Sequence, residues 1–227
     1  MRKKYQVLML ALTAAAAAGV GGSLALNTAE SAKVTKTISE KTLGVTENAK
    51  IQTDLKVNPG DVAELDYSVL NDGGEHSAGG SYDIYTKVNV YYGFDGADVK
   101  ENKPDDAAVK LNIETDGTNI TLDKYVDSYE KQYRAGDWII AYFDDEQIVM
   151  YGVRPLEKGE KSNDFLSSIE FDPSIGNEYS GRKFTIETTV DAVQKDNAKA
   201  AIAAEWGVFP EFDDNGNITY ISETENE

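Results

Sequence analysis

Residues 51–70 read IQTDLKVNPGDVAELDYSVL. Apolar or β-branched residues alternate with polar ones on both sides of the central Asn58-Pro59-Gly60-Asp61. Alternation at every second residue predicts a strand, and Pro followed by Gly predicts a tight turn. The stretch therefore predicts two β-strands, 51–57 and 62–70, joined by a turn.

Strand signals of the same kind continue along the chain. The strongest covers residues 82–94, in which tyrosine, isoleucine, threonine and valine alternate on one face. Residues 138–143 and 147–153 predict a hairpin around a short acidic turn, and 165–171 and 183–193 predict two more strands. Seven or more short strands separated by turns are typical of an antiparallel β-sandwich.

Short helical insertions are expected within this mainly β chain. Residues 122–133 place leucine, valine and tyrosine at helical spacing. Residues 195–205 are rich in alanine and also predict a helix. The end of the chain is polar, so we expect residues 213–227 to form a tail beyond a sandwich domain of residues 49–212.

The first 25 residues, 1–25, have the composition of a secretory signal peptide. The positive segment Arg2-Lys3-Lys4 precedes an apolar, alanine-rich run that ends in Gly21-Gly22-Ser23-Leu24-Ala25. Small residues at Ser23 and Ala25 occupy the positions that a signal peptidase reads. We expect cleavage between Ala25 and Leu26 and export of the rest. A retained membrane anchor is the alternative, although the apolar run is short for a span.

Charge and cysteine content exclude several classes of protein. The 227 residues contain 22 basic and 40 acidic groups, a formal charge of −18, and no cysteine. The signal peptide holds three of the basic groups and no acidic one, so the exported chain would carry 19 against 40, or −21. Such a polyanion repels nucleic acid and anionic lipid, so we expect no nucleic-acid partner and only a transient membrane contact through the signal peptide. Without cysteine, a disulfide scaffold and a cysteine-linked lipid anchor are excluded.

Candidate catalytic residues are few. The only histidine, His76, lies in the glycine-rich stretch 73–80, which suits a solvated linker better than a preorganised base. With no cysteine and no second histidine, the chain lacks the usual nucleophile–base pair and the histidine pair of helical zinc peptidases. Adjacent acidic residues are numerous, as chance alone produces among forty acids. We therefore predict no catalytic residue and no enzyme.

One segment partly matches a calcium-binding loop. Glu211, Asp213 and Asn215 have the spacing of its first ligands, but Ser222 stands where a bidentate Glu belongs. Asn215-Gly216 is also a common hairpin turn. We expect no cofactor, with calcium at these three residues as the candidate exception.

Tyrosine is abundant, with 13 residues. Tyr91 and Tyr92 are neighbours and would lie on opposite faces of one strand. Amphipathic rings on both faces suit a subunit interface, and ordinary strand packing explains them equally well.

Three features carry a resemblance to a known family. The leader ends in residues 21–26, GGSLAL, and residues 55–61, LKVNPGD, are followed by 67–73, YSVLNDG. Further along, residues 177–181, NEYSG, precede a strand that ends in Ala192-Val193-Gln194. Together these motifs resemble the TasA/camelysin family of exported bacterial proteins, which includes biofilm-matrix fibre subunits.

The resemblance implies a jelly-roll or immunoglobulin-like sandwich and assembly by donor-strand exchange, in which the N-terminal segment of one subunit adds a strand to the next. It also implies a dedicated signal peptidase as a partner, with an accessory fibre protein as a further candidate. The segment 26–48 alternates weakly and has no core of its own. We expect its donor strand to consist of Val34, Thr35, Lys36, Thr37 and Ile38. Val34 and Ile38 would fill pockets in a neighbouring copy.

The functional expectation is a non-catalytic subunit of extracellular or biofilm-matrix fibres that polymerises with itself. It would be secreted, in the extracellular matrix or at the cell surface. Two alternatives remain open: a secreted metalloprotease of the camelysin type, for which the residues give no chemical support, and a monomeric cell-surface adhesin.

Overall fold

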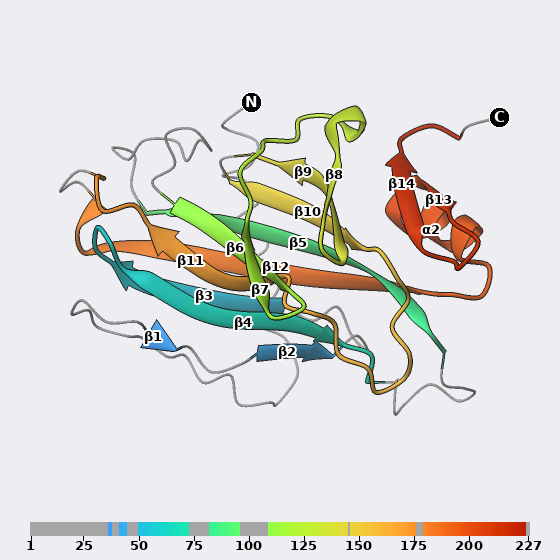
Figure 1. The fold of residues 1–227 in the computed structure, drawn as a ribbon, viewed down its shortest axis with the longest axis horizontal. Coiled ribbons are helices and arrows are strands. Elements are labelled where there is room, and N and C mark those ends of the chain that lie inside the picture. The colour runs from blue at the N-terminus through green and yellow to red at the C-terminus, as the bar shows by residue number, and fades with distance from the viewer. Residues whose placement is uncertain are drawn as a thin grey trace, which may run out of the picture.

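The computed structural model describes residues 36–37, 41–44, 50–72, 82–95, 109–144, 146–175 and 179–225. In this part of the chain two six-stranded sheets form a sandwich, and a two-stranded hairpin with an α-helix lies at one end (Figure 1). The mainly β sandwich predicted from the sequence is confirmed.

The strands of the two large sheets interleave along the sequence. Sheet A contains, in spatial order, β3 (Lys50–Val57), β12 (Arg182–Gln194), β5 (Ile84–Phe94), β10 (Gln147–Gly152), β9 (Trp138–Phe143) and β8 (Tyr133–Ala135). Sheet B contains β1 (Lys36–Thr37) and β2 (Lys41–Gly44), both beside β4 (Val62–Leu70), and then β11 (Leu166–Phe171), β6 (Val109–Thr115) and β7 (Thr118–Thr121). The described strands pair antiparallel, except that β1 and β2 run parallel to β4.

The main core lies between the two sheets. Leu65 and Val69 of β4 are fully buried, and so is Val88 of β5 in the opposite sheet. The rings of Phe171 on β11 and Phe184 on β12 meet edge to face with centroids 5.2 Å apart. β4, β5 and β12 thus contribute alternate side chains to one apolar layer, as the period-two pattern of the sequence predicts.

A second, smaller core lies on the outer face of sheet A. Tyr85 of β5 and Tyr151 of β10 are buried there, away from the main core. They pack in one cluster with Ile202 of the helix α2 (Ala198–Trp206) and Ile221 of the hairpin, which are both 0% exposed. The helix predicted at 195–205 is thereby confirmed.

The prediction of a polar tail at residues 213–227 is wrong. The hairpin strands β13 (Phe209–Phe212) and β14 (Ile218–Ser222) pair antiparallel, and Ile218 and Ile221 are buried. Polar residues concentrate in the turn between the strands, and they make the segment polar overall. The apolar residues of β14 are few, but they are buried.

Residues 122–133 do not form the predicted helix. Val126 instead exchanges two backbone hydrogen bonds with Phe143, each 2.9 Å long. Leu122 and Val126 are buried in the main core, and the segment has one short 3-10 turn, Tyr129–Lys131. The apolar residues of this segment reach the core from an extended backbone, although their spacing in the sequence is that of a helix.

The described tyrosines serve mainly as core residues. Tyr92 is buried in the main core and Tyr91 is half-buried on the other face of β5. Among the largest fully buried side chains are Tyr67, Tyr85, Tyr92, Tyr151 and Tyr179. Ordinary packing therefore explains these residues better than a subunit interface does.

Several predicted features lie outside the described residues. They are the signal peptide with its cleavage site at Ala25 and Leu26, the donor-strand residues Val34, Thr35 and Ile38, and the loop histidine His76.

Candidate functional site

The turn between β3 and β4 carries the chain from sheet A to sheet B. Asp61 Oδ2 accepts hydrogen bonds from the backbone N–H of Asn58 at 2.9 Å and from Asn58 Nδ2 at 3.3 Å. Gly60, at φ +82°, donates its N–H to the carbonyl of Phe171 at 2.8 Å, and Phe171 N–H donates to the carbonyl of Asp61 at 2.9 Å. A positive φ favours glycine. The predicted turn is confirmed, and its contacts with β11 fix where β4 begins.

Thr53 of β3 and Tyr67 of β4 meet across the core. Thr53 Oγ1 and Tyr67 OH are 2.5 Å apart, and both side chains are buried. Burial raises the pKa of Tyr67, and the hydrogen bond with Thr53 acts in the opposite direction. Because a buried hydroxyl needs a partner, this pair links β3, at one edge of sheet A, to β4.

The outer edge of β4 is occupied by the N-terminal segment of the same chain. β1 places Lys36 beside Ala63 and Thr37 beside Glu64. β2 runs along Tyr67–Leu70, with Thr42 beside Ser68. Figure 1 shows β1 and β2 as two separate short strands next to β4. A strand at the edge of a sheet presents backbone N–H and C=O groups to a further strand, and on this side of β4 the further strands are β1 and β2.

A bulge at Asp66 divides that edge into two parts. Asp66 has φ +49°, a left-handed conformation that is uncommon outside glycine. Two residues of β4 lie between Glu64 and Tyr67, whereas one residue of β11 lies between their partners Ser168 and Leu166. On the other side of β4, three residues of the sequence separate their partners Thr37 and Lys41. The ladder is therefore interrupted at the same place on both sides of β4.

Two of the five predicted donor-strand residues fall in a described strand. Lys36 and Thr37 form β1, and they pair with β4 of their own chain. The sequence analysis did not predict β2, because the four residues of Lys41–Gly44 carry little alternation and end in glycine.

The calcium candidate forms a self-contained turn. Asp213 Oδ1 accepts the backbone N–H of Asn215 at 2.9 Å and of Asn217 at 2.8 Å, and Asp213 Oδ2 accepts Asn217 Nδ2 at 2.9 Å. These hydrogen bonds, the one from the Asn217 side chain above all, lower the pKa of Asp213. Glu211 belongs to β13. Within the described ranges no three histidine or acidic side chains are grouped as metal ligands, and Asp213 serves its own turn.

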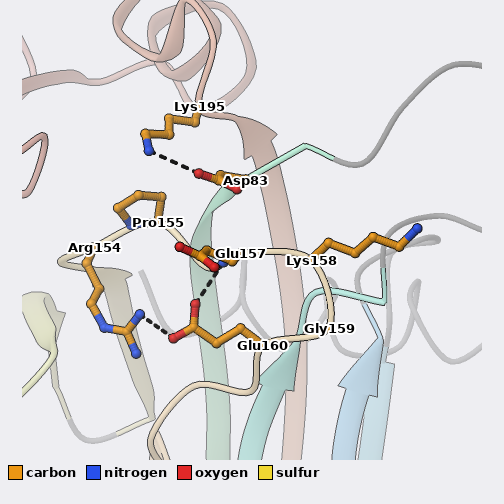
Figure 2. Close-up of a pocket in the computed structure, with 8 residues that line it drawn as sticks. All are labelled: Asp83, Arg154, Pro155, Glu157, Lys158, Gly159, Glu160 and Lys195. Atoms are coloured by element: carbon orange, nitrogen blue, oxygen red, sulfur yellow. Dashed lines mark hydrogen bonds and ion pairs between the residues drawn. The ribbon is translucent and has the colours of Figure 1, made fainter.

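A cavity of about 450 Å³ near the start of β5 is lined by charged side chains (Figure 2). Lys195 Nζ lies 3.0 Å from Asp83 Oδ2, and this contact raises the pKa of Lys195. Arg154 Nη1 lies 2.5 Å from Glu160 Oε1, while Glu160 Oε2 accepts the backbone N–H of Glu157 at 2.8 Å. The Lys195–Asp83 ion pair joins the end of β12 to the start of β5, whereas the contacts of Glu160 lie within the loop after β10. No local sequence pattern predicts this cluster, because its members come from three distant segments.

Comparisons with protein-family models, with curated proteins and with solved structures find no match for this chain. Among the residues described, no helix is long and apolar enough to cross a membrane. The resemblance to the TasA/camelysin family therefore rests on the quoted sequence motifs alone.

Proposed function

We propose that this chain is an exported structural subunit of extracellular or biofilm-matrix fibres, which polymerises head to tail by donor-strand exchange. The observation that carries the proposal is the edge of β4, which takes strands β1 and β2 in parallel orientation. The motifs shared with the TasA/camelysin family support the same mode of assembly. The proposal assigns no catalytic role and places the mature chain in the extracellular matrix or at the cell surface.

The edge of β4 suits a strand supplied by another copy. Leu65, Tyr67 and Val69, which face inward from β4, are already buried in the main core. The edge therefore needs only backbone partners, and an added strand supplies main-chain hydrogen bonds that depend little on its sequence.

A contact of this kind produces a filament. The donor segment precedes the sandwich, and the acceptor edge belongs to the sandwich itself, so the two contacting surfaces differ. Contacts between unlike surfaces repeat head to tail and, where the rotation does not close a ring, give open filaments.

Negative-stain electron microscopy of the chain from Leu26 onward tests the proposal. Residues 26–227 should form filaments, whereas residues 41–227 should remain folded monomers because part of the donor strand is missing. Size-exclusion chromatography and circular dichroism establish that the shorter chain is monomeric and folded. Filaments from the shorter chain, or none from the longer one, would contradict the proposal.

A matched pair of proline variants separates loss of the donor from general damage. Prolines at both Thr42 and Leu43 remove two backbone donors from β2 and should abolish filaments. The same two prolines at Thr224 and Glu225, beyond β14, should leave filaments intact. Equal filament formation by the two variants would show that β2 takes no part in assembly.

A further inference from the structure

The strands that cover the β4 edge belong to the same chain as β4. A backbone group on a sheet edge pairs with one neighbouring strand at a time. The edge cannot hold its own N-terminal segment and the segment of another copy together. The acceptor proposed above is therefore already filled in the single chain.

The covering ladder is short. β1 pairs over two residues and β2 over four, and the bulge at Asp66 separates them. By contrast, β12 pairs with β5 over the eleven residues from Phe184 to Gln194. Segments with few ladder contacts open at a lower free energy than core strands, so β1 and β2 can leave β4 while the sandwich stays folded.

A covering segment on the same chain competes strongly with a segment from another copy. Tethering gives it an effective concentration on the order of 1 mM. An incoming segment at a lower concentration is excluded until the tethered segment has been released. Release is thus the step that controls when a second copy can bind.

We propose that the strands β1 (Lys36–Thr37) and β2 (Lys41–Gly44) act as a latch, which covers the β4 edge of its own chain in the monomer and must leave before a second copy adds. The incoming copy takes the same parallel register, with its Thr42 beside Ser68. This inference rests on the proposed function and adds a controlled step to it. Each subunit exchanges its own strand for an identical one, so the exchange adds little strand-pairing free energy. Filament growth therefore begins with a lag.

A disulfide across the latch tests this directly, because the chain has no cysteine of its own. Thr42→Cys with Ser68→Cys places two thiols on directly paired residues of β2 and β4, a separation that suits a disulfide. Oxidised glutathione takes up the two electrons and two protons that the thiols lose, and becomes two reduced thiols. Because Ser68 is fully buried, Thr37→Cys with Glu64→Cys on β1 and β4 provides a second pair.

The locked monomer should not assemble. Oxidised as a dilute monomer, the paired variant should show an intramolecular disulfide by mass spectrometry and lose filament formation, and reduction should restore it. The matched control is Thr42→Cys with Thr118→Cys, whose second thiol lies on β7 at the opposite edge of sheet B. This control should form no intramolecular disulfide and should assemble equally well before and after oxidation.

The latch and the proposed function fail in different ways. The latch would be overturned if both cysteine-pair variants fold as monomers but form no intramolecular disulfide. It would also be overturned if disulfide-locked monomers assemble as fast as reduced ones. In either case filaments from the unsubstituted chain would leave the proposed function standing. Absence of filaments from the unsubstituted chain would overturn the proposed function, whatever the disulfide does.

Discussion

Thr53 Oγ1 on β3 and Tyr67 OH on β4 lie 2.5 Å apart, with both side chains buried between the sheets. β3 lies at one edge of sheet A, and β4 is the strand of sheet B that pairs with β1 and β2. The hydrogen bond therefore links the two sheets beside the proposed acceptor edge. It holds β4 in place independently of the N-terminal segment.

Removing either hydroxyl of this pair should destabilise the sandwich. Thr53→Val and Tyr67→Phe each remove the hydrogen bond between these two buried side chains, at a cost of about 1 kcal/mol in the free energy of unfolding. The double variant should cost less than the sum of the two single variants, because both single variants remove the same hydrogen bond. Urea unfolding of the four proteins gives the coupling energy. Strictly additive losses would show that the two hydroxyls do not depend on each other.

The bulge in β4 should tolerate only residues that accept a left-handed backbone. Asp66 has φ +49°. Asp66→Asn should be mild, since asparagine adopts this conformation readily, whereas Asp66→Val should lose about 1–2 kcal/mol more. Urea unfolding compares the two variants directly. Equal stability of Asp66→Asn and Asp66→Val would contradict the bulge.

The Asp213 turn should make a pH-dependent contribution to stability. Hydrogen bonds lower the pKa of Asp213 below its ordinary value of 3.8, so the folded state favours the ionised carboxylate. Its contribution is complete above the unfolded-state pKa and is lost as the pH falls through the lower folded-state pKa. Asp213→Ala should therefore reduce the unfolding free energy at pH 7, and this difference should shrink below pH 3.8.

The control for that experiment is the neighbouring acid. Asp214→Ala removes the same charge from an exposed position in the same turn. It should change stability little at either pH. Matching effects of Asp213→Ala and Asp214→Ala would assign the loss to net charge and would contradict the role of the Asp213 hydrogen bonds.

Filament growth should respond to salt. The chain from Leu26 onward carries 19 basic and 40 acidic groups, so approaching copies repel each other. Raising the ionic strength to 0.1 M shortens the screening length to about 10 Å, and growth followed by light scattering should accelerate. Lowering the pH toward the acidic pKa range should act in the same direction. Growth that slows as salt is added would contradict this role of the acidic surface.

The strands were predictable where alternation was strong and a turn was close by. Residues 51–57, 62–70 and 82–94 became β3, β4 and β5 with nearly the predicted bounds. β7 was missed because its four residues are mostly polar. β6 was missed although its apolar residues Val109, Leu111 and Ile113 alternate with polar ones, so its signal was present in the sequence. At the end of the chain, the polar composition outweighed the hairpin signal of Asn215-Gly216, so β14 was assigned to a tail.

The site was predictable in part. The turn at Asn58-Pro59-Gly60-Asp61 followed from local chemistry, and the extended character of Lys36 and Thr37 followed from weak alternation. The pairing of β1 and β2 with β4 of the same chain did not follow from the sequence, because parallel pairing joins segments with no local turn signal between them. The bulge at Asp66 likewise depends on contacts with β11, which no local pattern encodes.

The structure of the filament by electron cryo-microscopy tests donor-strand exchange most directly. We expect the strand beside β4 to come from a neighbouring copy, to run parallel to β4 and to place Thr42 next to Ser68. Filaments in which each subunit keeps its own β1 and β2 on β4, or in which the neighbour contacts another edge such as β3 or β7, would contradict it.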